Sequence, residues 1–359
     1  MSRLTIAVTG LNATDNPGPG VPVIRAIRDA DPNCCIIGLG YDALDPGAYM
    51  EGIADHVYLM PYPSQGTSVT LERLTQIQAQ TPIDVLIPTL DSELAGFLKL
   101  EPELRDLGIR TFLPSAESLR LRAKDHLGQL GERGVRVPQS INLTDAAAIA
   151  RLDEQIRFPV MVKGQFYEAS MAYSPMEVHG HFERLRAKWG LPIILQEYVA
   201  GVEYDVTVLG DGKGGVVGQV PMRKMQLTDK GKAWGGVTVA DAALTDFVNT
   251  TMAALQWRGP CELEIMRAHE GGACHLIEIN PRFPAWVYLC AGAGRNLPWA
   301  TVQLALGNHV EPMPPPLPGV LFLRHSLDQV CQLSDYQALT TVGELHREPT
   351  AAAATQEVA

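Results

Sequence analysis

The first hundred residues alternate short apolar runs with segments whose apolar residues recur at helical spacing. Short apolar runs predict β-strands, and apolar residues three to four positions apart predict helices. The strands are expected at 4–9, 35–39, 84–88 and 111–113, and the helices at 18–29 and 71–80. Because strands that alternate with helices favour a parallel sheet covered on both faces, we predict an α/β unit here.

The turn after the first strand occupies the position where dinucleotide-binding folds place their phosphate loop. The fingerprint G-x-G-x-x-G is absent from 10–20, and Pro17 and Pro19 remove backbone donors from this loop. We therefore expect a Rossmann-like unit without a bound dinucleotide. Asp91 and Glu93 follow the strand at 84–88, so both are candidate substrate contacts; an acidic first turn of a helix is the alternative, and it stays open.

The pattern changes after Pro114, where further strands no longer alternate strictly with helices. A helix is expected to begin at Ser115, to carry Lys124 and to continue past Leu127. Strands are predicted at 158–164, 193–199, 205–209 and 216–220, and helices at 244–255 and 296–306. This second region therefore has an α+β pattern, and a proline-rich connector follows it at 313–318.

Two strands near residue 270 alternate apolar with polar residues. In the stretch H-L-I-E-I-N-P-R at 275–282, Glu278 and Asn280 share one side of the strand, and Arg282 follows its end. A glycine-rich turn before this strand would place Glu264 of the preceding strand beside Glu278. Mg²⁺ prefers carboxylate and amide oxygens, and arginine pairs with phosphate, so the pattern suits a magnesium-bound polyphosphate. The solvated face of a sheet is the alternative for such a pattern.

Composition narrows the function classes. The length of 359 residues predicts roughly two domains, and an apolar content of 46% is enough to form their cores. Acidic residues outnumber basic ones by 40 to 29, and no basic run breaks this excess, so neither nucleic acid nor an anionic membrane is expected as a partner. No secretory signal is evident, and no apolar run approaches the ~18 residues of a membrane span. Six cysteines without C-x-x-C spacing favour reduced thiols, mostly in the core, and a cytoplasmic location.

Four motifs in order resemble those of the ATP-grasp superfamily. They are Lys124 after a helix start, F-P-V-x-V-K ending at Lys163, Q-E-Y-V-x-G-x-E at 196–203, and E-x(13)-E-I-N-P-R at 264–282. Within the superfamily they look most similar to the carbamoyl-phosphate-synthetase-like and biotin-carboxylase-like branch of carboxylate–amine ligases. The resemblance covers roughly residues 1–310.

The resemblance implies a Rossmann-like pre-ATP-grasp domain followed by an ATP-grasp fold, in which two α+β subdomains clasp ATP. The expected boundaries are 1–114 for the first domain and 115–312 for the second, with a small lid subdomain at 115–200 and a metal-binding subdomain at 201–312. A C-terminal extension is expected at 313–346 and a disordered tail at 347–359.

The resemblance also assigns roles to individual residues. Glu264, Glu278 and Asn280 would hold two Mg²⁺ ions, which Mn²⁺ could replace, and Arg282 would stabilise the transferring phosphoryl group. The nucleotide contacts it implies are Lys124 and Lys163 on the α- and β-phosphates, Gln196, Glu197 and Val199 at adenine, and Glu203 on the ribose, with Arg223 and Lys224 as further phosphate candidates.

The chain departs from the family pattern in two places. The loop at 165–174 lacks the glycines that usually cover the phosphates, and the segment after Phe283 is bulky at Trp286 and Tyr288, which would reshape the acceptor side. Residues 229–236 have the glycines and charge of a mobile lid, with a surface hairpin as the alternative. Arg295 is the candidate anchor for a substrate carboxylate.

We expect an ATP-dependent ligase that joins a carboxylate to an amine, on small molecules or peptides, through an acyl phosphate with release of ADP and phosphate. No biotin-domain or glutaminase signature is present, so a single ligase unit is expected, and a homodimer is left open as its assembly. A nucleotide-binding regulatory or partner subunit with weak catalysis is the main alternative, and a dinucleotide-dependent oxidoreductase is a third.

Overall fold

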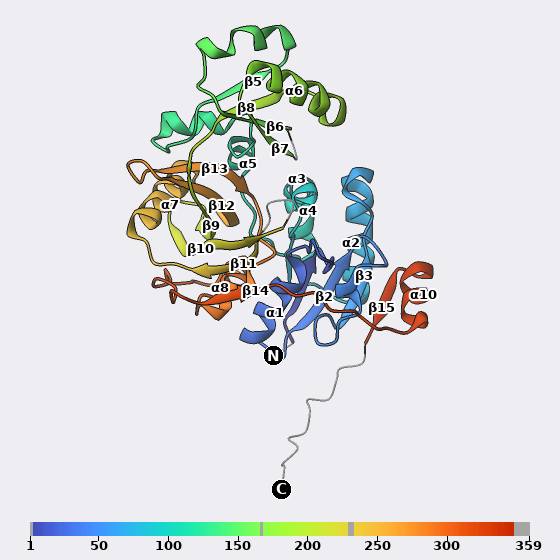
Figure 1. Cartoon of the computed structure of the whole chain (residues 1–359). Coiled ribbons are helices and arrows are strands. Elements are labelled where there is room, and N and C mark those ends of the chain that lie inside the picture. The colour runs from blue at the N-terminus through green and yellow to red at the C-terminus, as the bar shows by residue number, and fades with distance from the viewer. Residues whose placement is uncertain (1–2, 166–167, 229–232, 348–359) are drawn as a thin grey trace.

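A computed structural model describes residues 3–165, 168–228 and 233–347, which form three sheets (Figure 1). The first is a five-stranded sheet in the order β15-β3-β2-β1-β4. Its parallel strands are β1 (Thr5–Thr9), β2 (Cys35–Gly40), β3 (His56–Leu59) and β4 (Val85–Ile87). The chain's last strand, β15 (Glu344–His346), adds to β3 in the antiparallel direction. The predicted parallel sheet is therefore confirmed, with one edge supplied by a distant segment.

Helices connect the parallel strands as the apolar spacing predicts. They are α1 (Gly20–Ala30), α2 (Thr67–Gln80), α3 (Asp91–Lys99) and α4 (Glu101–Asp106), with short 3₁₀ turns η1 (Pro46–Ala48) and η2 (Pro63–Gln65). The predicted strand at 111–113 is wrong: only Arg110, just before it, forms an isolated bridge, to Val85. The structure instead has β3, whose short mixed sequence gave no clear apolar run.

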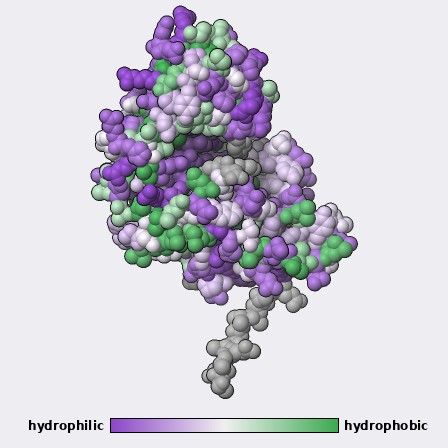
Figure 2. Space-filling model, viewed as in Figure 1, coloured by the Kyte–Doolittle hydropathy of each residue, from purple (hydrophilic) through white to green (hydrophobic). Residues whose placement is uncertain are grey.

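The four-stranded sheet, in the order β5-β8-β6-β7, forms the upper lobe of Figure 1. Its strands are β5 (Ser140–Leu143), β6 (Val160–Lys163), β7 (Ala169–Ala172) and β8 (Ile193–Glu197). Helix α6 (Pro175–Trp189) and 3₁₀ helix η4 (Ala146–Glu154) close its core, in which Val162, Phe182 and Leu195 are buried. On the face shown in Figure 2, hydrophilic residues predominate on this lobe.

The segment that leads into this lobe is less helical than expected. Helix α5 (Ala116–Leu121) ends before Lys124, and 3₁₀ helix η3 (Leu127–Arg133) follows. The predicted continuous helix past Leu127 is therefore wrong, and Lys124 lies in the turn between the two helices.

The six-stranded sheet has the order β13-β12-β9-β10-β11-β14. Its strands are β9 (Gly201–Asp211), β10 (Val216–Leu227), β11 (Ala233–Thr238), β12 (Arg258–Ala268), β13 (Cys274–Asn280) and β14 (Leu321–Leu323). The associated helices are α7 (Ala242–Leu255), α8 (Tyr288–Gly292) and α9 (Leu297–Ala305), while α10 (Leu333–Thr341) lies beside β15 of the parallel sheet. Side chains of α7, such as Val248 and Met252, share a core with Leu263 and Leu276 of β12 and β13, so the opposite face of these strands is left for polar residues.

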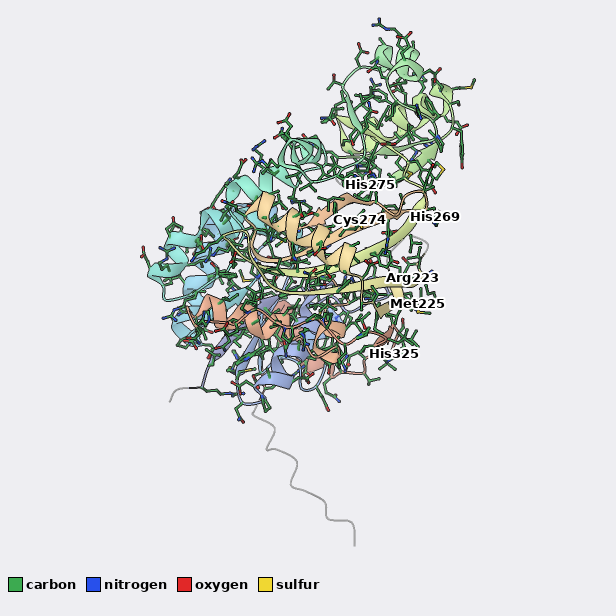
Figure 3. All side chains as sticks on the ribbon, turned by 90° about the vertical axis from the view of Figure 1, so that its left-hand side faces the viewer. Arg223, Met225, His269, Cys274, His275 and His325 are labelled. Carbon is green, nitrogen blue, oxygen red and sulfur yellow. The ribbon has the colours of Figure 1, made fainter. Side chains whose placement is uncertain are left out.

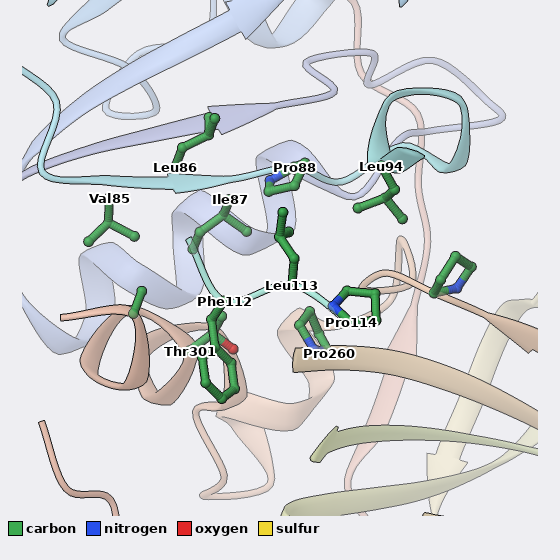
Figure 4. A pocket seen from close by; sticks show the side chains of 12 residues that line it. Val85, Leu86, Ile87, Pro88, Leu94, Phe112, Leu113, Pro114, Pro260 and Thr301 are labelled. Atoms are coloured by element: carbon green, nitrogen blue, oxygen red, sulfur yellow. The ribbon is translucent and has the colours of Figure 1, made fainter. Parts of the chain in front are cut away.

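One hydrophobic core joins the parallel sheet to the six-stranded sheet. Ile6 and Val8 of β1 belong to the same buried cluster as Val220 of β10 and Phe283. At this junction Pro88, which follows β4, and Pro281, which follows β13, line one small apolar cavity with Phe112 and Pro260 (Figure 4). The ends of β4 and β13 are therefore held next to each other. Among the described residues, no helix is long and apolar enough to cross a membrane.

Candidate functional site

Polar residues from three neighbouring strands face one another on the side of the six-stranded sheet opposite α7. Glu264 of β12 lies opposite Glu278 of β13, which confirms the predicted pairing, and Glu262 lies opposite Asn280. On the other side of β12, Glu264 lies opposite Asp205 of β9. Because directly opposed residues of antiparallel strands share a face, the sheet gathers four carboxylates and one amide in a single layer.

A β-bulge in β13 determines which of its residues lie on this polar face. The register shifts at Glu264–Ile265, so that Ile265 pairs with Leu276 and Ile277 is the extra residue of β13. Leu276 is fully buried in the core beneath the sheet, although it stands only two positions before Glu278. The extra residue turns the strand over between them and brings Glu278 to the polar face.

Two lysines approach Glu278 from outside the sheet. Lys124 Nζ lies 3.4 Å from Glu278 Oε1, and Lys163, at the end of β6, is only 7% exposed. Burial and the facing Glu264 raise the pKa of Glu278, although Lys124 and Lys163 act against this rise. Burial lowers the pKa of Lys163, and Glu278 counters it. The opposed pair Glu264–Glu278 is thus short of positive charge, which a divalent cation would supply.

The protein donors for such a cation are incomplete by themselves. Over the described part of the chain, no group of three or more His, Cys, Asp and Glu side chains could hold a metal ion. Glu264, Glu278 and Asn280 nevertheless offer hard oxygens of the type that Mg²⁺ prefers, and Mg²⁺ commonly takes its remaining ligands from phosphates and water. The donor set therefore fits Mg²⁺ bound together with a phosphate ligand.

Arg282 lies between two carboxylates at the end of β13. Its Nη1 is 3.5 Å from Glu262 Oε2, and its Nε is 3.3 Å from Asp91 Oδ2 at the start of α3. These two acids and the neighbouring Glu264 and Glu278 raise the arginine's pKa, although burial acts in the opposite direction. Asp91 is thus brought to the cluster, as its position after β4 predicts.

Lys224 of β10 completes the polar face on the far side of β9. Its Nζ lies 2.5 Å from Glu203 Oε1 and 3.2 Å from Asp205 Oδ2. Burial disfavours the lysine's charge, but Asp205, Glu264 and Glu203 outweigh it and raise the pKa of Lys224. Glu203, the expected ribose ligand, therefore already holds an ammonium group in this structure.

The strand expected to meet adenine, β8, lies between β5 and β6. Gln196 is buried, and its Nε2 lies 3.5 Å from Ser140 Oγ. The backbone N–H of Glu197 donates to the carbonyl of Gln139 at 2.8 Å, while Val199 is half-buried in the short segment between β8 and β9.

Two candidate substrate contacts have structural partners instead. Glu93 is buried, accepts hydrogen bonds from the N–H groups of Thr89 and Leu90 and from Tyr41 Oη, and also contacts Thr9 Oγ1. It is therefore a helix cap, the alternative that the sequence left open. The guanidinium of Arg295 donates to the carbonyls of Pro314 and Pro315. This arginine holds the proline-rich connector, and among the described residues no hydrogen bond or ion pair links it to the cluster.

The other expected residues lie at the margin of the site. Arg223 is exposed and adjacent to Lys224 on β10, so it points away from the polar face; Figure 3 shows it beside Met225 near the edge of the molecule. In the expected lid, 229–232 lie outside the described residues, and Gly235 and Gly236 pair with β10 as part of a hairpin. Phe166 and Tyr167, within the glycine-poor loop, also lie outside the described residues.

Three residues of the cluster, Asp205, Glu262 and Trp286, were not predicted as site residues. Glu262 is buried next to Asn280 and Arg282, and Trp286 donates from Nε1 to Glu262 Oε1 at 2.7 Å. The alternation of Glu262 with Glu264 placed both on one strand face, which was the available signal. No comparable pattern in the sequence indicates that the Trp286 indole turns back onto β12.

The sequence is also similar to known proteins. The family described as ATP-grasp in the biosynthetic pathway with Ter operon matches residues 191–324. The carbamoyl phosphate synthase large chain of Thermomicrobium roseum is 22% identical over 263 residues, covering 66% of this chain and 24% of that protein. The chain thus spans about a quarter of the length of this relative.

Two solved structures share the fold. A biotin carboxylase from Campylobacter jejuni, crystallised as a β,γ-ATP complex, superposes with a TM-score of 0.67 at 16% identity, over 86% of this chain and 72% of that one. An L-amino acid ligase from Bacillus licheniformis gives a TM-score of 0.63 at 16% identity, over 85% and 75% of the two chains. At this level of identity, the likeness establishes the architecture.

Proposed function

We propose that this chain, which belongs to the ATP-grasp superfamily, is an ATP-dependent ligase that joins a carboxylate to an amine and releases ADP and phosphate. ATP-grasp enzymes use ATP and Mg²⁺. The observation that carries the proposal is the opposition of Glu264 and Glu278 on one sheet face, with Lys124 against Glu278 and Arg282 at the strand end. This combination of hard oxygen ligands and basic side chains suits a metal-bound triphosphate better than it suits a dinucleotide.

The metal site of the proposed enzyme consists of Glu264, Glu278 and Asn280, which would hold two Mg²⁺ ions. When bound, Mg²⁺ would neutralise charge that develops on the phosphate oxygens during transfer. Lys124 and Lys163 would contact the α- and β-phosphates, since both approach Glu278 from elements outside the sheet. Their charges lie where a triphosphate that extends from the acidic face would pass.

The reaction has two steps. An oxygen of the substrate carboxylate attacks the γ-phosphorus, the bond to the β-phosphate oxygen breaks, and ADP and an acyl phosphate form. The amine nitrogen then attacks the acyl carbon, phosphate leaves with the bonding pair, and the nitrogen loses a proton to give the amide. Arg282 contributes fixed positive charge beside the transferring group, because phosphoryl transfer is catalysed mainly by positioning and electrostatics.

The nucleotide base would bind at the junction of the upper lobe and the six-stranded sheet. Gln196, Glu197 and Val199 are the proposed adenine contacts, the latter two through backbone groups, and Glu203 is the proposed ribose contact. Since the Glu197 N–H already binds Gln139, its carbonyl is the group left for the adenine amino group. Glu203 would have to share its carboxylate between Lys224 and the ribose.

The test is a screen of ADP and phosphate release over pairs of amino acids and short peptides, with and without hydroxylamine. A ligase of this type should form a hydroxamate that requires ATP, Mg²⁺ and the acid but not the amine. AMP with pyrophosphate would contradict the proposal, because the metal would then serve attack at the α-phosphorus. Tight ATP binding without turnover on any pair would instead favour a regulatory or partner subunit.

A further inference from the structure

Glu262 is a third carboxylate on β12 and β13, and its hydrogen bonds and ion pair are with donors of the site. The side chain is only 8% exposed. Its Oε1 accepts from Trp286 Nε1 at 2.7 Å, and its Oε2 accepts from Asn280 Nδ2 at 3.1 Å and lies 3.5 Å from Arg282 Nη1. Burial and the nearby Glu264 raise the pKa of Glu262, while Arg282 and Trp286 oppose the rise.

These contacts fix the orientation of Asn280. Its Nδ2 donates to Glu262 Oε2 and also to Glu264 Oε1, both at 3.1 Å. With both N–H bonds of the amide used in this way, the carbonyl oxygen is directed away from the two carboxylates and remains available to a cation. Rotation of the amide would place a carbonyl against two carboxylate oxygens, which electrostatic repulsion opposes.

Trp286 in turn fixes Glu262. The indole is 5% exposed and packs in the core that joins the two larger sheets, so its Nε1 has little freedom to move. It follows Arg282 by four residues, in the bulky segment that departs from the usual family pattern. A buried indole needs a hydrogen-bond acceptor, and here that acceptor is the same carboxylate that contacts Asn280 and Arg282.

We infer that Glu262 is the positioning residue of this site, held by the Trp286 indole, and that it orients Asn280 toward the metal and Arg282 toward the phosphoryl group. The inference rests on the proposed function. Glu262 would contact neither the metal nor the nucleotide and would act only through its neighbours. Groups that orient metal ligands in this manner typically change metal affinity or activity by about 10- to 100-fold when they are removed.

The test compares Glu262→Gln and Trp286→Phe with Trp257→Phe as the matched control. Trp257 is also a buried indole, but its Nε1 donates to the Pro260 carbonyl, away from the carboxylates. Calorimetry would measure ADP binding in Mg²⁺ and in EDTA, and steady-state assays would give kcat and the KM for ATP. We expect both site variants to lose about 10- to 100-fold of the Mg²⁺-dependent ADP affinity and to retain the affinity in EDTA. A general loss of structure would lower both affinities.

The double variant tests whether the two residues act in one chain of contacts. Trp286→Phe should cost little more in the Glu262→Gln background, because residues that act through each other are not additive. Site variants that match wild type or Trp257→Phe, or whose effects add fully, would overturn the role of Glu262. A wild-type protein that binds no metal nucleotide would overturn the proposed function itself, and this role of Glu262 with it.

Discussion

Asp91 Oδ2 lies 3.3 Å from Arg282 Nε, which joins the first residue of α3, just after β4, to a residue just after β13. The two side chains are 31% and 20% exposed, so the ion pair is partly screened by solvent. The shared core beneath them already holds the two strand ends together. The contact therefore orients Arg282 more than it stabilises the fold.

Asp91→Asn should consequently affect catalysis more than stability. We expect the free energy of unfolding to change by at most about 1 kcal/mol, as for other partly exposed ion pairs. Turnover should fall, because Arg282 loses one of the two carboxylates that fix it. Chemical denaturation and ADP release would measure the two effects, and Glu103→Gln on α4 is the control. A variant that loses stability but retains full kcat would contradict the expectation that Asp91 acts mainly on catalysis.

Glu278→Gln should abolish turnover and leave the fold intact. The substitution removes the charge that faces Glu264 and Lys124, and with it a ligand of the proposed metal. Metal stabilisation of a phosphoryl transition state amounts to several kcal/mol, so kcat should fall roughly 100-fold or more. The assay is ADP release at saturating Mg²⁺, with circular dichroism to verify the fold. The exposed Glu117→Gln is the matched control; full activity of Glu278→Gln would remove the metal assignment.

Glu203→Ala should raise the KM for ATP more than it lowers kcat, since a ribose contact is made equally in the ground state and the transition state. Lys224 keeps Asp205 as a partner in this variant, which limits the disturbance of the polar face. Steady-state kinetics over a range of ATP concentrations would measure both constants, with Glu183→Ala on α6 as the control. Were kcat alone to fall, Glu203 would act in the chemical step and not on the ribose.

Asp55 should make stability depend on pH far from the site. Burial disfavours its charge, but the Ile36 N–H, Arg28 and Arg3 outweigh burial and lower the pKa of this carboxyl. A lowered pKa in the folded state means that its stabilisation is present above the unfolded value of about 3.9 and is lost as pH falls through the folded value.

Wild type should therefore exceed Asp55→Asn in unfolding free energy by about 1.5–3 kcal/mol at neutral pH, the range for hydrogen bonds to a charged group. Urea denaturation between pH 7 and pH 3 would measure the difference, which should be constant down to about pH 5 and then shrink. A difference that grows on acidification would show that the folded state does not favour the ionised carboxyl.

The sequence predicted elements whose signal is local. Three of the parallel strands, β1, β2 and β4, and α1 follow from the spacing of apolar residues, and the pairing of Glu264 with Glu278 follows from alternation on two strands joined by a short turn. The bulge at Ile277 was not predicted, although the adjacent apolar residues Leu276 and Ile277 interrupt the alternation at that point.

Contacts between distant segments were the least predictable part. The addition of β15 to β3 and the hydrogen bond from Trp286 to Glu262 depend on tertiary packing that no window of sequence contains. Arg295 shows how a contact of this kind changes an interpretation. A lone arginine after β13 predicts an anion ligand, but in the structure its guanidinium donates to backbone carbonyls of the proline-rich connector.

Two connecting segments join the upper lobe to the rest of the chain (Figure 1). One runs between η3 and β5, and the other runs between β8 and β9. These two segments lie side by side, because the Glu197 N–H donates to the Gln139 carbonyl. Two adjacent connecting segments form a hinge and define its axis. Rotation of the lobe about this axis would leave Glu197 and Val199 almost in place and would carry Lys163 toward or away from Glu278. Adenine bound near this axis would then stay in place while Lys163 approaches and leaves the phosphates.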